Sequence, residues 1–250
     1  MKTIILAAGY ATRLYPLTEN FPKPLLTVGG KPILDWLIED IHTSALVDGY
    51  IVVSNHRFAD IFRRWADGHA LPITVVDDGT DTNQTRLGAV RDIRYALEKT
   101  GVRDDVLVIA GDNVLDFSLV PFLAFGRESG CSCVMCYEEN EPARQRRTAI
   151  ITVDGSGAIT SYEEKPPVPK SSLAVPPFYF YKARDIARIG EALDAGCGWD
   201  APGSFAAWLS GQTPMRAYRM PGRRYDVGNL ESYEAIRTSY RGIVVPPQNP

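Results

Sequence analysis

Short apolar runs alternate with amphipathic segments between residues 3 and 112, and this alternation restricts the fold more than any other feature of the chain. A short apolar run between turn residues is typical of a buried strand, and apolar residues three or four apart are typical of a helix. Strands and helices that alternate in this way form a parallel sheet with helices on both faces. Strands are expected at 3–8, 49–55, 71–78 and 105–112, and helices at 31–45, 57–68 and 86–101.

The second part of the chain has a different pattern. An Asp-Gly turn at 154–155 separates two alternating runs, which indicates a β-hairpin. A strand and an amphipathic helix follow over 178–196, and then a short helix over 200–209. We therefore expect an α/β protein with a Rossmann-like, mostly parallel mixed sheet and a small β-rich part. A single domain is expected over 1–250, with halves at about 1–126 and about 127–245.

Composition and charge argue against several classes of protein. The formal net charge is −3 without long runs of like charge, whereas a nucleic-acid binder usually has a basic excess. No stretch approaches the ~20 apolar residues of a membrane helix. The N-terminal apolar run is too short for a secretory signal. We therefore expect a cytoplasmic protein with no nucleic-acid or membrane partner.

Three of the four cysteines, Cys131, Cys133 and Cys136, lie in one short stretch, and Cys197 lies further on. Four cysteines can form a zinc site. However, the C-x-C-x-x-C spacing is not a strong zinc pattern, and no histidine lies nearby. Because cysteine also behaves as a small apolar residue, the stretch is better interpreted as a buried strand.

Two features follow strand ends and therefore belong to one edge of the sheet, where ligands bind in folds of this class. Gly9 follows the first strand and Asp112 the last one of the first half. A glycine there lets backbone N–H groups approach a ligand closely. Arg13 adds a forked cation suited to phosphate, and Lys23 stands between two prolines. We interpret the segment as a loop that wraps the phosphates of a nucleoside triphosphate, although the P-loop string is absent.

The stretch LAAGYATRLYPLTENFPKPLL, residues 6–26, strongly resembles the signature of the sugar-phosphate nucleotidyltransferases, the family that includes glucose-1-phosphate thymidylyltransferase. IAGDNVLDFSL (109–119), SYEEKP (161–166) and YDVGNLESYEA (225–235) also resemble that family, so the resemblance covers most of the chain. It implies the GT-A-like form of the α/β fold, with the β-rich part binding the acceptor.

On the nucleotide side, the resemblance assigns two kinds of contact. The backbone around Leu6, Ala8 and Gly9 would contact the nucleotide. Arg13 and Lys23 would hold its phosphates and act as the catalytic cations.

The resemblance also implies a metal site and an acceptor site. Asp112 and Asp226 would bind Mg²⁺, which suits carboxylates together with phosphate oxygens and water. Glu164 and Lys165 would bind the acceptor, with the lysine on its phosphate.

Base recognition stays open. The family has a glutamine about five residues before a glycine; here Asn83 is five before Gly88, with Gln84 beside it. Asn83, Gln84 and Gly88 would thus belong to the nucleotide-binding site. Either amide can pair with a base edge, so neither fixes the base.

The acceptor side departs from the family at two places. Pro177 stands where the family usually has a glycine, and proline has no N–H to donate. Arg223 and Arg224 precede Asp226, where the family often has an aromatic pair. The arginines indicate either a solvated hairpin turn or an acceptor with extra negative charge.

These residues together predict a Mg²⁺-dependent transfer. A phosphate oxygen of a sugar 1-phosphate would attack the α-phosphorus of a nucleoside triphosphate, a pyrimidine nucleotide being favoured, to give an NDP-sugar and pyrophosphate. The alternative is a cytidylyltransferase for a small phosphorylated alcohol or phosphonate. A more remote alternative is a non-catalytic nucleotide-binding regulatory protein. The protein is expected to be a monomer or a homodimer.

Overall fold

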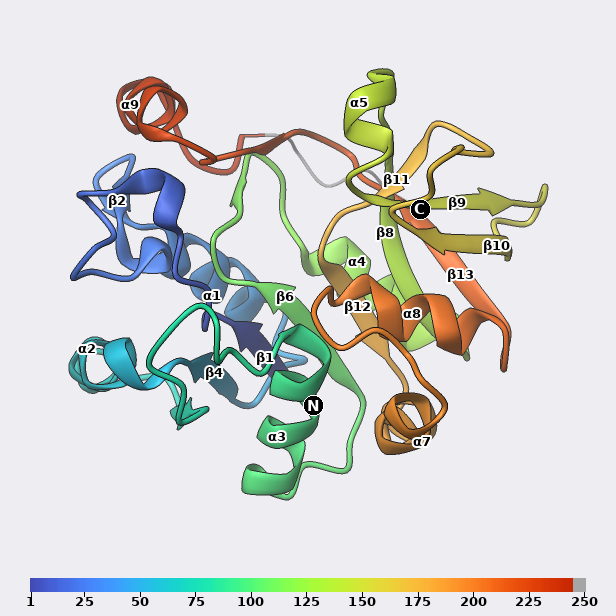
Figure 1. The fold of residues 1–250 in the computed structure, drawn as a ribbon, viewed down its shortest axis with the longest axis horizontal. Helices are drawn as coiled ribbons and strands as arrows, with labels where there is room; N and C mark the ends of the chain where they lie inside the picture. The colour runs from blue at the N-terminus through green and yellow to red at the C-terminus, as the bar shows by residue number, and fades with distance from the viewer. Residues whose placement is uncertain (245–250) are drawn as a thin grey trace. The chain divides into compact units, whose positions relative to one another are not determined.

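The computed structural model describes residues 1–244, which form two compact units (Figure 1). The first unit contains residues 1–87, 110–121 and the chain from 221 onward. The second unit contains residues 88–109 and 122–220. The chain thus leaves the first unit twice and returns to it twice.

The first unit is built on three parallel strands, β1 (Lys2–Leu6), β4 (Tyr50–Ser54) and β5 (Ile73–Asp77), with β4 in the middle. Every residue of β4 is buried, which explains its continuous apolar sequence. Helices α1 (Ile33–Thr43) and α2 (His56–Asp67) follow β1 and β4 in the chain. These five elements confirm the strands and helices expected from the sequence.

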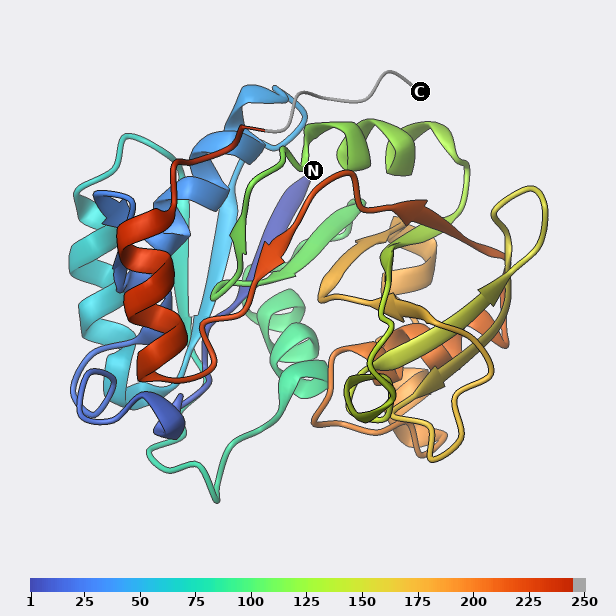
Figure 2. The same ribbon diagram turned by 90° about the horizontal axis from the view of Figure 1, so that it is seen from above.

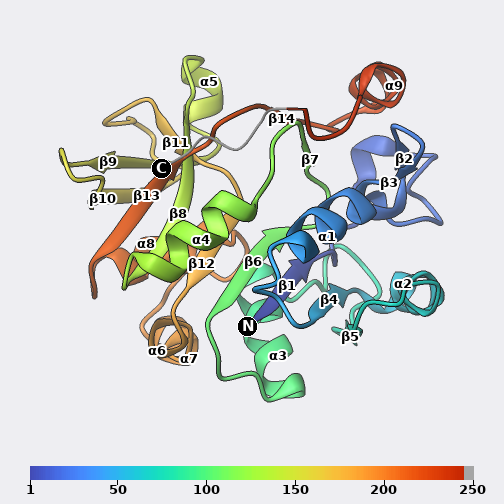
Figure 3. The same ribbon diagram turned by 180° about the vertical axis from the view of Figure 1, so that it is seen from behind.

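Helix α1 packs through the stripe that the sequence predicted. Its buried residues are Ile33, Leu34, Leu37, Ile38 and Ile41, three or four positions apart. Figure 3 shows α1 in front of β1, and Figure 1 shows it behind, so the helix covers one face of the parallel strands.

Short elements complete the first unit. A buried cluster joins the loop after β1 to α9 and includes Leu14, Val28, Val114, Val227 and Tyr233. Segments from both ends of the chain therefore pack together, and α9 lies beside the segment of β2 (Figures 1 and 2). The short elements are the 3₁₀ helices η1 (Thr12–Leu14) and η2 (Lys23–Leu25), the strand pairs β2 (Thr27–Val28) with β3 (Lys31–Pro32) and β7 (Val114–Leu115) with β14 (Arg224–Tyr225), and helix α9 (Leu230–Ser239).

The second unit is the β-rich part, and most of its strand pairs are antiparallel. Its strands run in the order β10, β9, β11, β8, β12, β6, and β13 is parallel to β8. Their bounds are β6 (Val106–Ala110), β8 (Ser132–Glu138), β9 (Ala149–Val153), β10 (Ile159–Glu164), β11 (Leu173–Val175), β12 (Phe178–Tyr181) and β13 (Met215–Arg219).

The hairpin expected around the Asp-Gly turn is present as β9 and β10, which pair antiparallel. The Asp154 carboxylate closes the turn by accepting from the N–H groups of Ser156 and Ala158. The helices of this unit are α3 (Ala89–Thr100), α4 (Val120–Glu128), α5 (Pro142–Gln145), α6 (Ala183–Ile186), α7 (Ile189–Asp194) and α8 (Gly203–Ser210).

The cysteine-rich stretch forms β8, the buried strand that its apolar sequence predicted. Cys133 and Cys136 are 0% and 1% exposed. Burial raises the pKa of Cys136 to about 11, so this thiol stays protonated at neutral pH. No cluster of three or more His, Cys, Asp or Glu side chains suited to a metal occurs within residues 1–244.

The fold class is the expected α/β Rossmann-like class: β1, β4 and β5 of the first unit pair in parallel, and most strand pairs of the second unit are antiparallel. The assignment of a single domain with halves meeting near residue 126 stays a prediction. Within the part of the chain that the structure describes, no helix is long and apolar enough to cross a membrane.

Candidate active site

The loop after β1 is fixed by buried side chains. The Nδ2 of Asn55 donates to the carbonyl of Ala8 at 2.9 Å, and the Thr18 hydroxyl donates to that of Ala11 at 2.8 Å. A Cβ added to Gly9 would meet nothing within 4 Å. Packing therefore does not require glycine at this position, whereas the close approach of a ligand would explain it.

The two predicted phosphate cations differ in their surroundings. Arg13 lies in η1, is exposed, and forms no hydrogen bond or ion pair with residues 1–244. Lys23 begins η2, and its side chain is only 12% exposed. Its Nζ donates to Oδ2 of Asp112 at 2.6 Å. Arg13 is thus available to a ligand, while Lys23 is held beside a carboxylate.

Asp112 stays ionised at neutral pH. Burial alone would raise the pKa of its carboxyl, but the charge and hydrogen bond of Lys23 and the charge of Arg224 outweigh that effect. The pKa of Asp112 therefore lies below its ordinary value.

The backbone brings Asp112 and Asp226 to the same end of a strand pair. The Gly111 N–H donates to the carbonyl of Leu6 at 2.9 Å, which fixes this segment beside the end of β1. In the β7–β14 pair, Tyr225 lies opposite Val114. The next antiparallel position sets Asp226 opposite Asn113, one residue from Asp112.

These two carboxylates fit Mg²⁺. The Asp226 side chain is exposed and has no hydrogen bond or ion pair with any described residue, and Lys23 engages only one oxygen of Asp112. Mg²⁺ is usually bound by one or two carboxylates together with water and substrate phosphates, rather than by a closed protein cage. The donor set of Asp112 and Asp226 has that character.

Asn83 and Gln84 line a hollow of about 230 Å³ in the first unit. Both side chains are exposed, and the Asn83 carbonyl accepts from Arg86 at 2.7 Å. The hollow brings the two amides to the loop that contains Tyr10 and Thr12. It is also lined by Tyr15, Arg57, Asp81 and Thr82.

Gly88 belongs to the second unit, and packing explains it. It precedes α3 with φ of 88°, a backbone conformation that side chains rarely adopt. A Cβ there would lie 2.7 Å from the Trp199 carbonyl oxygen. The fold therefore requires a glycine at this position without any ligand.

Glu164 and Lys165 lie together at the end of β10 in the second unit. Lys165 is exposed and has a left-handed φ of 48°. The half-buried Glu164 carboxylate packs against Gly203 at the start of α8, which itself lies against β10. Burial raises the pKa of Glu164, although the charge of Lys165 acts in the opposite direction. Neither side chain has a hydrogen-bonded or ion-paired partner within residues 1–244.

Two tyrosines near Glu164 were not predicted from the sequence. The hydroxyls of Tyr162 and Tyr181 are buried and have no hydrogen-bond partner among the described residues. Tyr162 precedes Glu164 by two positions on β10, so their side chains share one face of the strand. That period of two was the signal available in the sequence.

The two arginines before Asp226 have different environments. Arg223 is exposed, as a solvated turn would leave it. Arg224 lies in β14, and its guanidinium donates to Oδ1 of the buried Asn113 at 3.3 Å. Of the two arginines, only Arg224 therefore contributes to the surroundings of Asp112.

Pro177 precedes β12 and has no N–H of its own. The N–H of Phe178, the next residue, donates to the Pro176 carbonyl.

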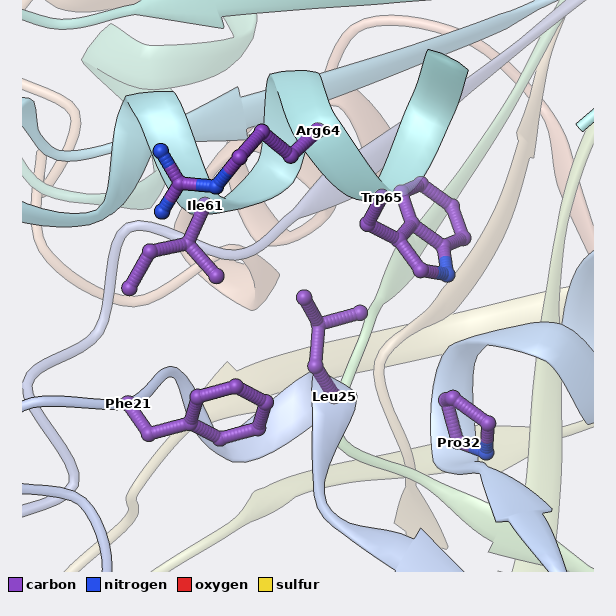
Figure 4. A pocket seen from close by; sticks show the side chains of 6 residues that line it. All are labelled: Phe21, Leu25, Pro32, Ile61, Arg64 and Trp65. Atoms are coloured by element: carbon purple, nitrogen blue, oxygen red, sulfur yellow. The ribbon is translucent and has the colours of Figure 1, made fainter. Parts of the chain in front are cut away.

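A second hollow in the first unit, of about 360 Å³, contains none of the predicted site residues. Figure 4 shows Ile61, Arg64 and Trp65 of α2 on one side of it. Its other lining residues are Phe21, Leu25 and Pro32. Because this lining is largely apolar and holds only one cation, the hollow does not suit a triphosphate.

Comparisons with known proteins show which proteins this chain resembles. A family model described as "Nucleotidyl transferase" matches residues 2–241. The UTP–glucose-1-phosphate uridylyltransferase of Synechocystis is 25% identical over 248 residues, or 95% of this chain. The chain spans only 63% of the length of that relative. The uridylyltransferase of the same name from Haloferax volcanii is 27% identical, with 92% of this chain and 93% of the relative covered.

A solved structure from Bacillus anthracis has the same fold. That protein is provisionally named a glucose-1-phosphate thymidylyltransferase and was crystallised with a sucrose. It is 24% identical, with a TM-score of 0.81 over 99% of this chain and 98% of that one.

Proposed function

Because the chain belongs to the nucleotidyl transferase family, we propose that it joins a nucleoside triphosphate to a sugar 1-phosphate in a Mg²⁺-dependent reaction. The products are an NDP-sugar and pyrophosphate. The observation that carries this proposal is the pairing of β7 with β14, which sets Asp226 opposite the neighbour of Asp112. Lys23 lies at hydrogen-bond distance from Asp112, so cations and metal-binding carboxylates occur together.

The reaction needs no protein base. An oxygen of the acceptor phosphate, already ionised at neutral pH, forms a bond to the α-phosphorus of the triphosphate. The bond from that phosphorus to the bridging oxygen breaks, and pyrophosphate leaves in line. Arg13 and Lys23 bind the phosphates and stabilise the charge that develops on them. Asp112 and Asp226 would hold Mg²⁺, which would further neutralise that charge.

For the nucleotide, we propose a pyrimidine triphosphate. The Synechocystis and Haloferax relatives are named as UTP–glucose-1-phosphate uridylyltransferases. The amides of Asn83 and Gln84 line the hollow beside the phosphate loop, and an amide can donate to and accept from a pyrimidine edge.

For the acceptor, we propose that Lys165 binds the phosphate and Glu164 accepts from sugar hydroxyls. A carboxylate without a partner is suited to accept such bonds. The second candidate is a cytidylyltransferase for a small phosphorylated alcohol or phosphonate. Pro177 favours it, because a proline cannot donate the backbone hydrogen bond that the family's glycine supplies to the sugar.

The test is pyrophosphate release with Mg²⁺, with UTP, dTTP, CTP, ATP and GTP crossed against hexose 1-phosphates and small phosphorylated alcohols. Activity with a hexose 1-phosphate, lost in Asp112→Asn, supports the proposal. Activity only with CTP and a non-sugar phosphate supports the second candidate. Nucleotide binding without any turnover would indicate a non-catalytic binding protein.

Nucleoside triphosphates are cytoplasmic substrates, so we place the reaction in the cytoplasm. We further propose that the enzyme is a monomer or a homodimer, which size-exclusion chromatography with light scattering distinguishes.

A further inference from the structure

Asp116 is a buried carboxylate that joins two distant segments of the first unit. It is 9% exposed and follows β7 directly. Its Oδ1 accepts from the Arg223 N–H at 2.7 Å, and its Oδ2 accepts from the Tyr225 hydroxyl at 3.1 Å. Its own N–H donates to the Arg223 carbonyl at 3.2 Å. Asp116 therefore holds β14 from both sides of Arg224.

The strand pair that Asp116 borders is too short to fix its own alignment. β7 and β14 have 2 residues each. Isolated two-stranded pairs are marginally stable even when longer. A slip of one residue would turn every side chain of β14 to the opposite face. The hydrogen bonds of Asp116 therefore determine which side chains of the segment face Asp112.

Neighbouring contacts show how closely the two segments approach at Asp116. A Cβ added to Gly222 would collide with Oδ1 of Asp116 and lie 3.0 Å from Cβ of Phe117. The Tyr240 hydroxyl donates to the Leu115 carbonyl at 2.6 Å, and its ring packs edge-on against Tyr225. No cation forms an ion pair with Asp116 within residues 1–244. The two oxygens of its carboxylate instead accept hydrogen bonds from the β14 segment, from the Arg223 N–H and the Tyr225 hydroxyl.

We propose that Asp116 is a positioning residue for the metal site. By fixing the register of β14 on β7, it sets the separation of the Asp112 and Asp226 carboxylates, without contacting the metal itself. This inference rests on the proposed function, because it requires those two aspartates to bind a divalent cation. Substitution of residues that orient metal ligands typically weakens metal binding about 10- to 100-fold.

The experiment measures Mn²⁺ binding to the full chain by electron paramagnetic resonance, with and without a non-hydrolysable UTP analogue. Asp116→Ala removes both acceptor oxygens and should weaken Mn²⁺ binding about 10- to 100-fold. Asp116→Asn keeps an oxygen for the Arg223 N–H, and its amide can donate to Tyr225. It should therefore bind Mn²⁺ within about threefold of the wild type, although it carries no charge.

Asp40→Ala is the matched control, because Asp40 also accepts a backbone N–H in the first unit, that of Leu119. It should bind Mn²⁺ as the wild type does. Far-ultraviolet circular dichroism would establish that each variant is folded at the temperature of the titration. If Asp116→Ala does not fold, Tyr225→Phe removes one of the same hydrogen bonds and decides the question, with a several-fold weakening expected.

Three results separate the possible failures. Mn²⁺ affinity unchanged in folded Asp116→Ala, or in Tyr225→Phe where the alanine variant is unfolded, overturns the positioning role. An equal loss in Asp116→Asn and Asp116→Ala overturns it as well, because the charge alone would then be responsible. Mn²⁺ binding unaffected by Asp226→Asn would instead contradict the proposed metal site itself.

Discussion

The two units hold their candidate site residues in different ways. In the first unit, Lys23 is bonded to Asp112 and Arg224 to Asn113. In the second unit, Glu164 and Lys165 have no such partner among the described residues, and the hydroxyl of Tyr162 is buried without one. Among the residues proposed for phosphate and metal, Lys23 and Asp112 are thus held by a protein partner, while Arg13 and Asp226 are not. Both residues proposed for the acceptor keep their hydrogen-bonding capacity for a ligand. Under the proposed function, we expect substitutions in the first unit to change the rate of the chemistry and substitutions in the second to change the binding of the acceptor.

The largest expected effect belongs to the metal carboxylates. Asp112→Asn removes a proposed metal ligand and the ion-pair partner of Lys23, and should lower kcat about 10³-fold, which corresponds to about 4 kcal/mol. Pyrophosphate release measures the change. The control is Asp60→Asn, an exposed aspartate on α2 whose one ion pair among residues 1–244 is with Arg63; this variant should keep full activity. Comparable rates for the two variants would refute the assigned role of Asp112.

Arg13 should have the next largest effect. Its exposed guanidinium is free to bind phosphate, and Arg13→Ala should lower kcat/KM about 100-fold, or about 3 kcal/mol, by analogy with the loss of one oxyanion donor. Arg64→Ala, at another exposed arginine of the same unit, is the control and should have no effect on rate. Steady-state kinetics for both substrates would measure the change. If the second unit binds the acceptor, the KM of the acceptor should be unchanged in Arg13→Ala.

Gly203→Ala tests the second unit separately. The new methyl group would occupy the space of the Glu164 carboxylate and displace it. We expect the KM of the acceptor to rise several-fold to about 10-fold, about 1 kcal/mol, with the KM of the nucleotide unchanged. Stability should not fall, because alanine favours a helix more than glycine does.

The control for that substitution is Gly190→Ala in α7, where an added Cβ meets nothing within 4 Å. It should leave both KM values unchanged. A change in the nucleotide KM of Gly203→Ala, with the acceptor KM constant, would contradict the division of roles between the units.

The smallest effect concerns stability and pH. Burial raises the pKa of Glu164 in the folded state above its value in the unfolded chain, so ionisation of Glu164 destabilises the folded state. The free energy of unfolding therefore declines as pH rises from the unfolded-state pKa to the raised folded-state pKa. Glu164→Gln should therefore raise the melting temperature at pH 7 by less than about 3 °C, and the gain should vanish in acid, where Glu164 is protonated.

Glu138, in the same unit, should show the opposite effect of a glutamine substitution on stability. Hydrogen bonds from Arg219 and Ser172 lower its pKa, so Glu138→Gln should slightly reduce stability at pH 7, and this difference should also vanish in acid as Glu138 becomes protonated in the wild type. Melting curves at pH 7 and in acid measure both variants. A fall in melting temperature at pH 7 for both glutamine variants would show that the ionised, unpartnered Glu164 carboxylate does not destabilise the folded state.

The parallel strands and α1 could be predicted from the sequence because each is long enough to display its period. Stripes such as Leu34, Leu37, Ile38 and Ile41 contain the signal themselves. The pairing of β7 with β14 could not be predicted, since 2 residues display no period and their partners lie 107 or more positions apart. Asp116 for the same reason looks like a polar residue in an apolar run until the register is known.

The site residues likewise divide into those that the sequence could name and those that only the structure reveals or explains. Arg13 was singled out from the loop after the first strand, Asp226 was named only from the resemblance to a family, and both roles stay predictions. Gly88 was assigned to nucleotide binding, yet Trp199 gives it a packing reason that no local pattern could reveal. Tyr162 and Tyr181 were missed because aromatic residues in a strand usually indicate only a core.

The first unit is discontinuous in the chain, and this has a consequence for its synthesis. The three parallel strands are complete once residue 77 has been made, but Tyr225 and Asp226 are translated only after the whole second unit. A nascent chain on the ribosome therefore contains the three strands and the loop after β1 well before it contains Asp226, the second carboxylate proposed for the metal. Under the proposed function, the site is completed only by the last-made segment, and we expect a chain that stalls or is clipped before residue 225 to be inactive.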